Sequence, residues 1–174
     1  MSVLTANPRR EMEIHRFPLI VYALVSLIAL VLQAWLPRVV TSRFAWFDLP
    51  LIVTVYFSLS RRSQIQGALM GCFLGLFEDA LTHRPIGING VAKTVVGYVA
   101  ASFGVRIDVE NFTIRLLMTF ALSLLSSALY LFVYRIVLGL TIDWNWIFEL
   151  FKAMGNSAIA LLLFPTLDRF KVRD

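Results

Sequence analysis

The chain has 174 residues and a formal net charge of +5, and 59% of its residues are hydrophobic while only 16% are charged. A soluble domain of this length would be nearer half apolar and a quarter charged, so the composition excludes an ordinary water-facing fold. The apolar residues form long blocks, which is typical of membrane-spanning helices. The basic residues lie at the ends of these blocks and form no stripe, so we expect no nucleic-acid partner.

Six apolar blocks are candidates for membrane-spanning helices, each of which needs roughly 20 residues. They cover residues 17–36, 45–59, 65–81, 87–105, 114–138 and 146–163. The second block is short, and we expect Trp46 and Phe47 to anchor its start in the membrane interface. We therefore predict an all-α integral membrane protein with a cytoplasmic segment over residues 1–16, a six-helix transmembrane bundle over 17–167 and a cytoplasmic basic tail over 168–174.

The distribution of lysine and arginine between alternate loops predicts the orientation of this bundle. One side of the membrane would carry ten of these residues and the other side four. Because cytoplasmic loops are enriched in lysine and arginine, both termini are predicted to be cytoplasmic. The basic ends would also face the anionic cytoplasmic leaflet, so membrane lipid is an expected partner.

Small residues recur along one face of the third and fourth blocks. They are Gly67, Gly71 and Gly75 in the third block, and Gly87, Gly90 and Gly97 in the fourth. Glycines spaced four residues apart let another helix approach closely in lipid. The two stripes predict either that these helices pack together as antiparallel neighbours or that they bind a partner helix, and they would also permit a homodimer.

Several ionisable or strongly polar side chains lie within the predicted spans. They are Glu78, Asp79, Lys93, Arg135, Glu149, Lys152 and, at mid-span, Asn156. In the predicted orientation the six charged residues share the outer leaflet, where unpaired charges are costly. Two interpretations compete: an ion-pair network that fixes helix register, or a polar cavity that opens to the outside and holds a ligand or a partner's polar residue.

The sequence contains no pattern typical of a catalytic or metal site. Cys72 is the only cysteine, and the two histidines lie near the ends of different spans. Ser123, Ser126 and Ser127 are interpreted as small packing residues, and we expect no base beside a nucleophile. We therefore predict a protein that is not an enzyme and holds no cofactor.

Four short segments resemble the MreD family of bacterial rod shape-determining membrane proteins, over about residues 17–170. The segments are Leu32-Gln33-Ala34-Trp35-Leu36; Phe47-Asp48-Leu49 with Val55-Tyr56-Phe57-Ser58-Leu59; Gly71-x3-Gly75-Leu76-x2-Asp79 with Pro85-Ile86-Gly87-Ile88-Asn89 and Val96-Gly97-Tyr98; and Asn156 with Phe164-Pro165. The third segment, a hairpin, is the most specific. Departures from the family pattern are Phe47, where a proline is expected and whose role Pro50 could take, and Glu78 and Lys93, where apolar or small residues are expected.

The resemblance implies a non-enzymatic scaffold of the elongasome, or rod complex, in the bacterial inner membrane. Such a protein acts with the single-pass protein MreC and, directly or through MreC, with an elongation glycosyltransferase and a transpeptidase of peptidoglycan synthesis. The family is also similar in fold to the substrate-binding subunits of energy-coupling-factor transporters. The alternative function, suggested by the charged residues in the outer leaflet, is a small-molecule-binding membrane subunit of a transporter.

Overall fold

The structure is a computed structural model that describes residues 18–39, 47–107, 111–141 and 144–169. All the regular structure in these ranges is helical, and the prediction of six helices is confirmed. The helices are α1 (Leu19–Val39), α2 (Leu49–Arg61), α3 (Gln64–Leu81), α4 (Ile88–Arg106), α5 (Phe112–Phe132), which continues into the π-helical turn η2 (Val133–Val137), and α6 (Trp146–Asp168).

Three stretches of the described chain are long and apolar enough to cross a membrane, by length and composition: Ile88–Arg106, Phe112–Val137 and Trp146–Asp168. Shorter apolar helices cover Ile20–Trp35 and Leu49–Arg61. Membrane crossing by all six helices therefore stays a prediction.

The boundaries of α2 and α6 differ from the predicted ones. Helix α2 begins at Leu49, because the Asp48 side chain accepts a hydrogen bond from the backbone N–H of Leu51 at 2.9 Å and so caps the helix. Phe47 packs against Gly155 of α6. Its role as an interfacial anchor stays a prediction, and Trp46 lies outside the described residues. Helix α6 continues beyond residue 163 to its last residue, 168, with a proline inside its final turns.

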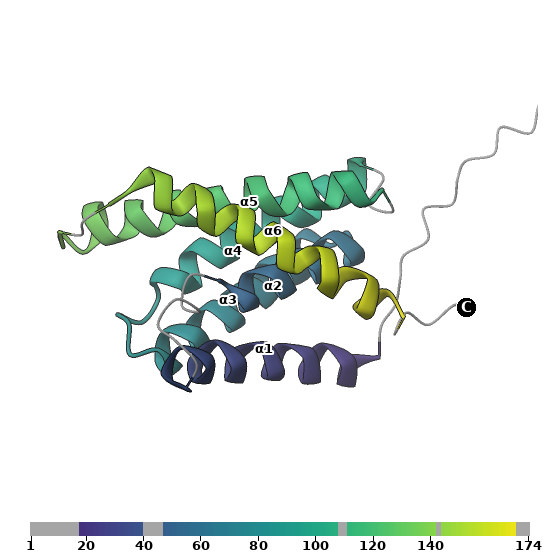
Figure 1. Ribbon diagram of the computed structural model, residues 1–174, viewed down its shortest axis with the longest axis horizontal. Helices are drawn as coiled ribbons and strands as arrows, with labels where there is room; N and C mark the ends of the chain where they lie inside the picture. Colours follow the sequence, from purple (N-terminus) through teal and green to yellow (C-terminus); the bar gives the residue numbers. More distant parts are fainter. Residues whose placement is uncertain (1–17, 40–46, 108–110, 142–143, 170–174) are drawn as a thin grey trace, which may run out of the picture.

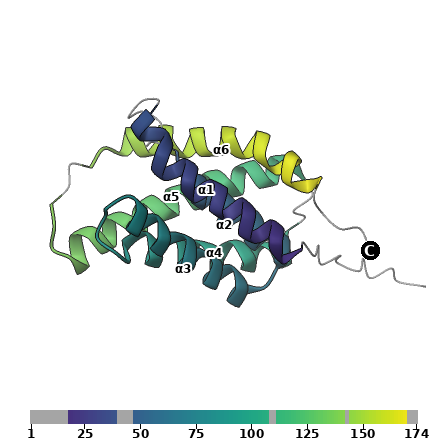
Figure 2. The same ribbon diagram turned by 90° about the horizontal axis from the view of Figure 1, so that it is seen from below.

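The helices are arranged in three layers (Figure 1). Helix α1 lies alone on one side, α2, α3 and α4 form the middle layer, and α5 and α6 lie on the opposite side. The start of α1 and the end of α6 lie at the same end of the molecule. Figure 2, seen from the α1 side, shows α1 passing in front of α2, with which it is in contact.

Helix α2 is the centre of the bundle. Every residue from Pro50 to Ser60 is buried, and α2 contacts each of the other five helices. At 1.5 Å per residue its 13 residues span about 20 Å, which is less than the roughly 30 Å hydrocarbon core of a bilayer. Its short length, already visible in the second apolar block of the sequence, fits a helix that is enclosed by protein.

Helices α3 and α4 are antiparallel neighbours whose backbones meet at glycines. A Cβ atom added to any of the three α3 glycines would fall on a backbone carbonyl of α4. The facing pairs are Gly67 with Gly97, Gly71 with Lys93, and Gly75 with Asn89. The glycine stripes are thus used for packing within the chain.

The other two glycines of the predicted stripe behave differently. Gly90 faces the side chain of Leu76. The prediction that Gly87 packs against a helix needs correction, because a Cβ there would meet no atom within 4 Å. Gly87 instead starts α4 with φ of +106°, a backbone conformation that side chains other than glycine rarely adopt.

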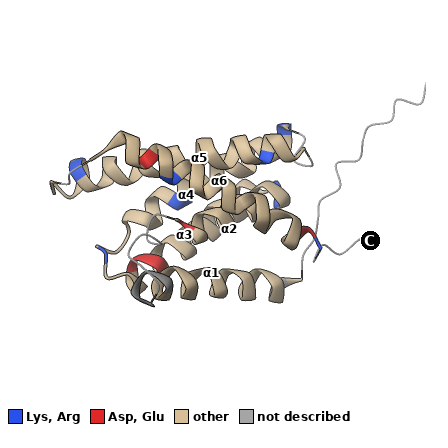
Figure 3. Cartoon of the chain, in the orientation of Figure 1, with Lys and Arg blue, Asp and Glu red and all other residues tan. Residues whose placement is uncertain are grey.

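Much of the outer surface is apolar, as expected for a protein surrounded by lipid. Large hydrophobic side chains are exposed on α1, on α3 and on α6, including Leu24 and Leu27, Ile65 and Phe73, and Phe151 and Leu162. Figure 3 shows that charged residues are few over the helix surfaces and gather mainly toward the helix ends.

Candidate functional site

A cluster of buried polar side chains lies where the start of α2, the end of α3, and the starts of α4 and α6 meet, with α5 beside them. At its centre the Lys93 ammonium group forms ion pairs with Asp48, at 2.9 Å, and with Glu78. Lys93 is 0% exposed, and the two carboxylates are also buried. One cation is therefore shared by two carboxylates in a buried site, where charges are stable only when paired.

Asp48 joins this triad to a hydrogen-bond network at the start of α2. Its backbone N–H donates to the Asn156 side-chain oxygen at 2.9 Å, and the Asn156 amide donates to the Ser123 hydroxyl at 2.6 Å. On the other side, Gln33 donates to the Phe47 carbonyl at 2.9 Å and accepts from the Leu49 N–H at 3.1 Å. Helices α1, α5 and α6 thus hold the turn that presents Asp48.

Asp79 caps α4. Its carboxylate accepts hydrogen bonds from the backbone N–H groups of Gly87 at 2.9 Å and Asn89 at 3.1 Å, and from the Asn89 side chain at 2.8 Å. Backbone N–H groups at a helix N-terminus have no partner within the helix, and the helix dipole favours an anion there. A buried acid at the end of α3 therefore fixes the loop to α4 and the entry of that helix.

A polar cavity of about 400 Å³ lies beside the triad. Its lining comes from the residue that caps α2, the α3–α4 loop, helices α4 and α5, and α6 with the two residues before it. The lining residues are Asp48, Arg84, Asn89, Ser126, Ser127, Tyr130, Trp144, Asn145, Phe148, Glu149 and Lys152. Asp48 therefore both binds Lys93 and lines the cavity, so the charge cluster and the cavity form one site.

The cavity wall contains groups with and without partners. Glu149 accepts a 2.5 Å hydrogen bond from the Ser127 hydroxyl and lies 3.6 Å from the Lys152 ammonium group. The Arg84 guanidinium lies over the Tyr130 ring, 5.9 Å from its centroid. The buried indole N–H of Trp144 has no hydrogen-bond partner among the described residues. A hydrogen-bond acceptor inside the cavity could satisfy it.

The prediction that no base lies beside a nucleophile needs correction at Ser127, whose hydroxyl donates to the Glu149 carboxylate. This contact is not sufficient for acyl transfer, which also requires hydrogen-bond donors placed around a substrate oxyanion. The geometry supports a polar wall held by hydrogen bonds.

The structure gathers most of the predicted polar residues at this site: Glu78, Asp79, Lys93, Glu149, Lys152 and Asn156. Arg135 is exposed in η2 and does not line the cavity. The last α5 residue in the lining is Tyr130, and Arg135 lies more than one helical turn beyond it. Sequence reasoning missed Asp48, Arg84 and Trp144 as members of the site. One feature of the sequence could have identified Asp48 as a helix cap. An aspartate two residues before a proline is typical of a helix start.

A second ion pair lies at the opposite end of α2. The Arg115 guanidinium binds the Asp168 carboxylate at 2.6 Å, and the Tyr56 hydroxyl donates to the same carboxylate at 2.8 Å. This contact ties α2 and α5 to the last residue of α6.

Fold and site together define a helical membrane protein with an apolar exterior and a buried charge cluster beside a polar cavity. A family model for the rod shape-determining protein MreD matches residues 14–171, nearly the whole chain. The chain belongs to the MreD family, a family of membrane proteins with a role in determining rod shape.

No curated protein and no solved structure matches the chain. The expected likeness to the substrate-binding subunits of energy-coupling-factor transporters therefore finds no support among solved structures.

Proposed function

We propose that this protein is a non-enzymatic scaffold of the elongasome that binds an MreC-like single-pass protein in the bacterial inner membrane. The observation that carries the proposal is the match of the MreD family over residues 14–171. Through MreC, or directly, the scaffold would work with the elongation glycosyltransferase and the transpeptidase to control cell shape. Both termini would be cytoplasmic, with residues 1–16 and the basic tail from residue 168 on that side.

The partner helix is expected to dock on an outer apolar face. The glycine faces of α3 and α4 are occupied by each other, which leaves no small-residue groove between these two helices for a partner or for a homodimer contact. Exposed apolar side chains on α1, α3 and α6 remain, such as Leu24, Ile65 and Phe151. In lipid, close packing of such surfaces drives helix association.

The test is purification in mild detergent from the native bacterium, with mass spectrometry of the proteins that remain bound. Recovery of an MreC-like protein in amounts comparable to the bait is the expected result. A photo-crosslinking residue placed in turn at Leu24, Ile65 and Phe151 then identifies the face that the partner helix touches. Recovery of an ATPase module without any cell-wall protein would contradict the proposal.

One observation favours a second function, a small-molecule-binding membrane subunit. The polar cavity combines a cationic wall residue, Arg84, with the indole N–H of Trp144, which has no hydrogen-bond partner within the described ranges. A small number of convergent polar groups in a concave site is typical of ligand pockets.

The second function predicts a saturable rise in thermal stability with a vitamin or a cell-wall precursor. The Trp144→Phe variant, which removes the N–H and keeps an aromatic ring, should abolish the rise. Trp35→Phe, the same change at an exposed tryptophan outside the cavity lining, is the matched control. A flat response of the wild-type protein to these compounds would leave the scaffold as the supported function.

A further inference from the structure

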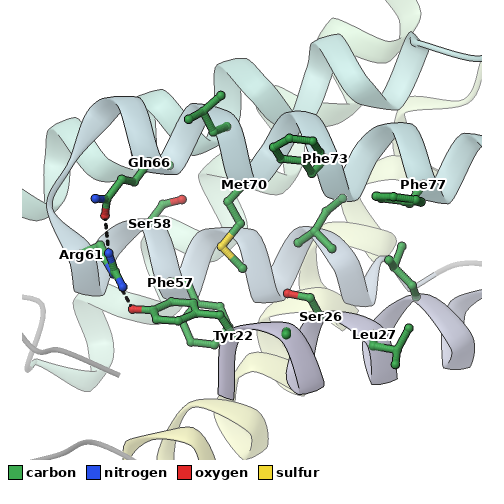
Figure 4. Close-up of a pocket in the computed structure, with 15 residues that line it drawn as sticks. Tyr22, Ser26, Leu27, Phe57, Ser58, Arg61, Gln66, Met70, Phe73 and Phe77 are labelled. Carbon is green, nitrogen blue, oxygen red and sulfur yellow. Dashed lines mark hydrogen bonds between the residues drawn. The ribbon is translucent and has the colours of Figure 1, made fainter. Parts of the chain in front are cut away.

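An apolar groove of about 530 Å³ lies between α1 and α3, with α2 as its floor. Figure 4 shows Tyr22, Ser26 and Leu27 of α1 along one wall, and Met70, Phe73 and Phe77 of α3 along the other. Apart from its end at Arg61 and Gln66, the lining is almost entirely hydrophobic. The groove belongs neither to the charge cluster nor to the polar cavity.

The length and lining of the groove fit a hydrocarbon chain. Its α3 wall runs from Gln66 to Phe77, which is about 17 Å at 1.5 Å per residue. An elongated apolar surface that ends at a cation matches a lipid, whose acyl chain is apolar and whose headgroup is charged.

One end of the groove carries a positive charge that is held in a fixed orientation. The Arg61 Nε donates to the Tyr22 hydroxyl at 2.7 Å, and its Nη1 donates to the Gln66 side chain at 2.7 Å. The guanidinium also lies 4.6 Å from the Tyr22 ring centroid. Figure 4 shows these contacts at the Arg61 end, with Leu27 and Phe77 at the other end.

The charge at this end has no acidic partner in the described part of the chain. No described carboxylate pairs with Arg61, or with the next residue, Arg62, whose Nε and Nη1 atoms are buried without hydrogen-bond partners. A guanidinium has five N–H donors, and the contacts to Tyr22 and Gln66 use two of those on Arg61. The remaining donors fit a phosphate, which arginine binds through paired, charge-assisted hydrogen bonds.

We propose that this groove binds one anionic phospholipid, with an acyl chain between α1 and α3 and the headgroup phosphate at Arg61. The Arg61 end of α2 is opposite the Asp48 end, and the proposed orientation places it at the cytoplasmic leaflet, where anionic lipids are abundant. This lipid site does not depend on an MreC-like partner, so the two proposals can fail separately.

The test is native mass spectrometry of the purified full-length chain with phosphatidylglycerol or phosphatidylcholine of identical acyl chains. We expect at least tenfold more retained phosphatidylglycerol than phosphatidylcholine. Arg61→Gln should lower phosphatidylglycerol retention about tenfold. The matched control Arg106→Gln, which removes a charge at the end of α4 outside the groove, should leave it unchanged.

A second pair of variants tests the hydrocarbon site while keeping Arg61. Ser26→Phe places a ring on the α1 wall of the groove, and Ile28→Phe places one on an exposed part of the same helix. Ser26→Phe should remove the tightly held lipid, and Ile28→Phe should not. This pair decides the proposal even if Arg61→Gln does not fold.

Three results would overturn the lipid site. The first is equal retention of the two lipids by the wild-type protein. The second is an equal loss of phosphatidylglycerol in Arg61→Gln and Arg106→Gln, and the third is equal lipid retention in Ser26→Phe and Ile28→Phe. A photo-crosslinker at Met70 that captures a partner's helix and no lipid would also overturn it.

Discussion

Lys93 is the residue on which the charge cluster depends. Its ammonium group is fully buried and contacts both Asp48 and Glu78, so it links the start of α2 to the end of α3. A buried ion pair is not in itself a strong source of stability, because removing the charges from water is costly. Removal of one member is nevertheless severe, because the others stay charged without compensation.

The Lys93→Met variant should therefore be strongly destabilised, by about 3–5 kcal/mol. The measurement is the free energy of unfolding of the purified protein in detergent, followed by tryptophan fluorescence. Lys152→Met is the matched control, because Lys152 is a partly exposed lysine 3.6 Å from its carboxylate. Exposed pairs contribute about 0–1 kcal/mol, so the control should stay close to wild type.

A triple variant, Asp48→Asn with Glu78→Gln and Lys93→Met, separates charge balance from packing. It removes all three charges and keeps a side chain at residue 48 that can cap a helix. We expect it to recover most of the stability lost in Lys93→Met. A triple variant as unstable as the single one would show that the length and shape of the lysine side chain matter more than its charge.

At the scale of elements, the contact between α3 and α4 determines how the site is built. The glycines of α3 bring its backbone against α4, and this close approach places Glu78 beside Lys93 and Asp79 at the first residues of α4. In lipid, such contacts replace the hydrophobic effect as the force that joins helices.

Gly71→Ala should weaken this contact, and Gly71→Leu should disrupt it. Even the single methyl group of alanine would fall on the Lys93 backbone carbonyl, so the helices must move apart. Ala80→Leu places the same leucine side chain on the exposed face of the same helix, without this clash, and should behave like wild type. The measurement is the thermal midpoint of monodisperse protein. A Gly71→Leu variant as stable as the control would contradict the assignment of this glycine to packing.

Local signals made the helices predictable from the sequence. Apolar blocks placed all six, and the small-residue stripes with the short loop between the third and fourth blocks indicated the antiparallel α3–α4 pair. The stripe of the fourth block wrongly included Gly87, since a turn glycine and a packing glycine look alike in one sequence. The start of α2 was also misplaced, because the apolar block continues upstream of the Asp48 cap.

At the scale of the whole molecule, the apolar outer surface and the arrangement of the helix ends are consistent with a bundle that crosses the membrane six times. The first residue of α1 and the last of α6 lie at one end (Figure 1), as an even number of crossings requires. The charge cluster lies toward the other end.

Labelling of introduced cysteines with a membrane-impermeant maleimide tests this topology, in a background with Cys72→Ser. Ile86→Cys, in the exposed α3–α4 loop, should react in intact spheroplasts. Thr113→Cys, exposed at the start of α5, should react only after the membrane is permeabilised. The reverse pattern would show that the protein has the opposite orientation in the membrane. Equal labelling of both positions from outside would contradict a six-span bundle.

The site was less predictable than the bundle because its contacts are long-range. Glu78 and Lys93 are 15 residues apart within one hairpin, and their similar depth indicated a pair. Asp48 is 45 residues from Lys93 and 108 residues from Asn156, and these contacts depend on how the layers stack. A single sequence contains no periodic signal for such stacking.

The enclosure of α2 has a consequence for biosynthesis. Helix α2 is the second helix to leave the ribosome, yet its two ends are satisfied by the last helix, through Asn156 at the Asp48 N–H and Asp168 at the Tyr56 hydroxyl. A nascent chain that stops before Trp146 leaves both groups without these partners in the membrane. We expect such truncated chains to be recognised by membrane quality-control proteases, and α2 to reach its final surroundings only when translation has finished.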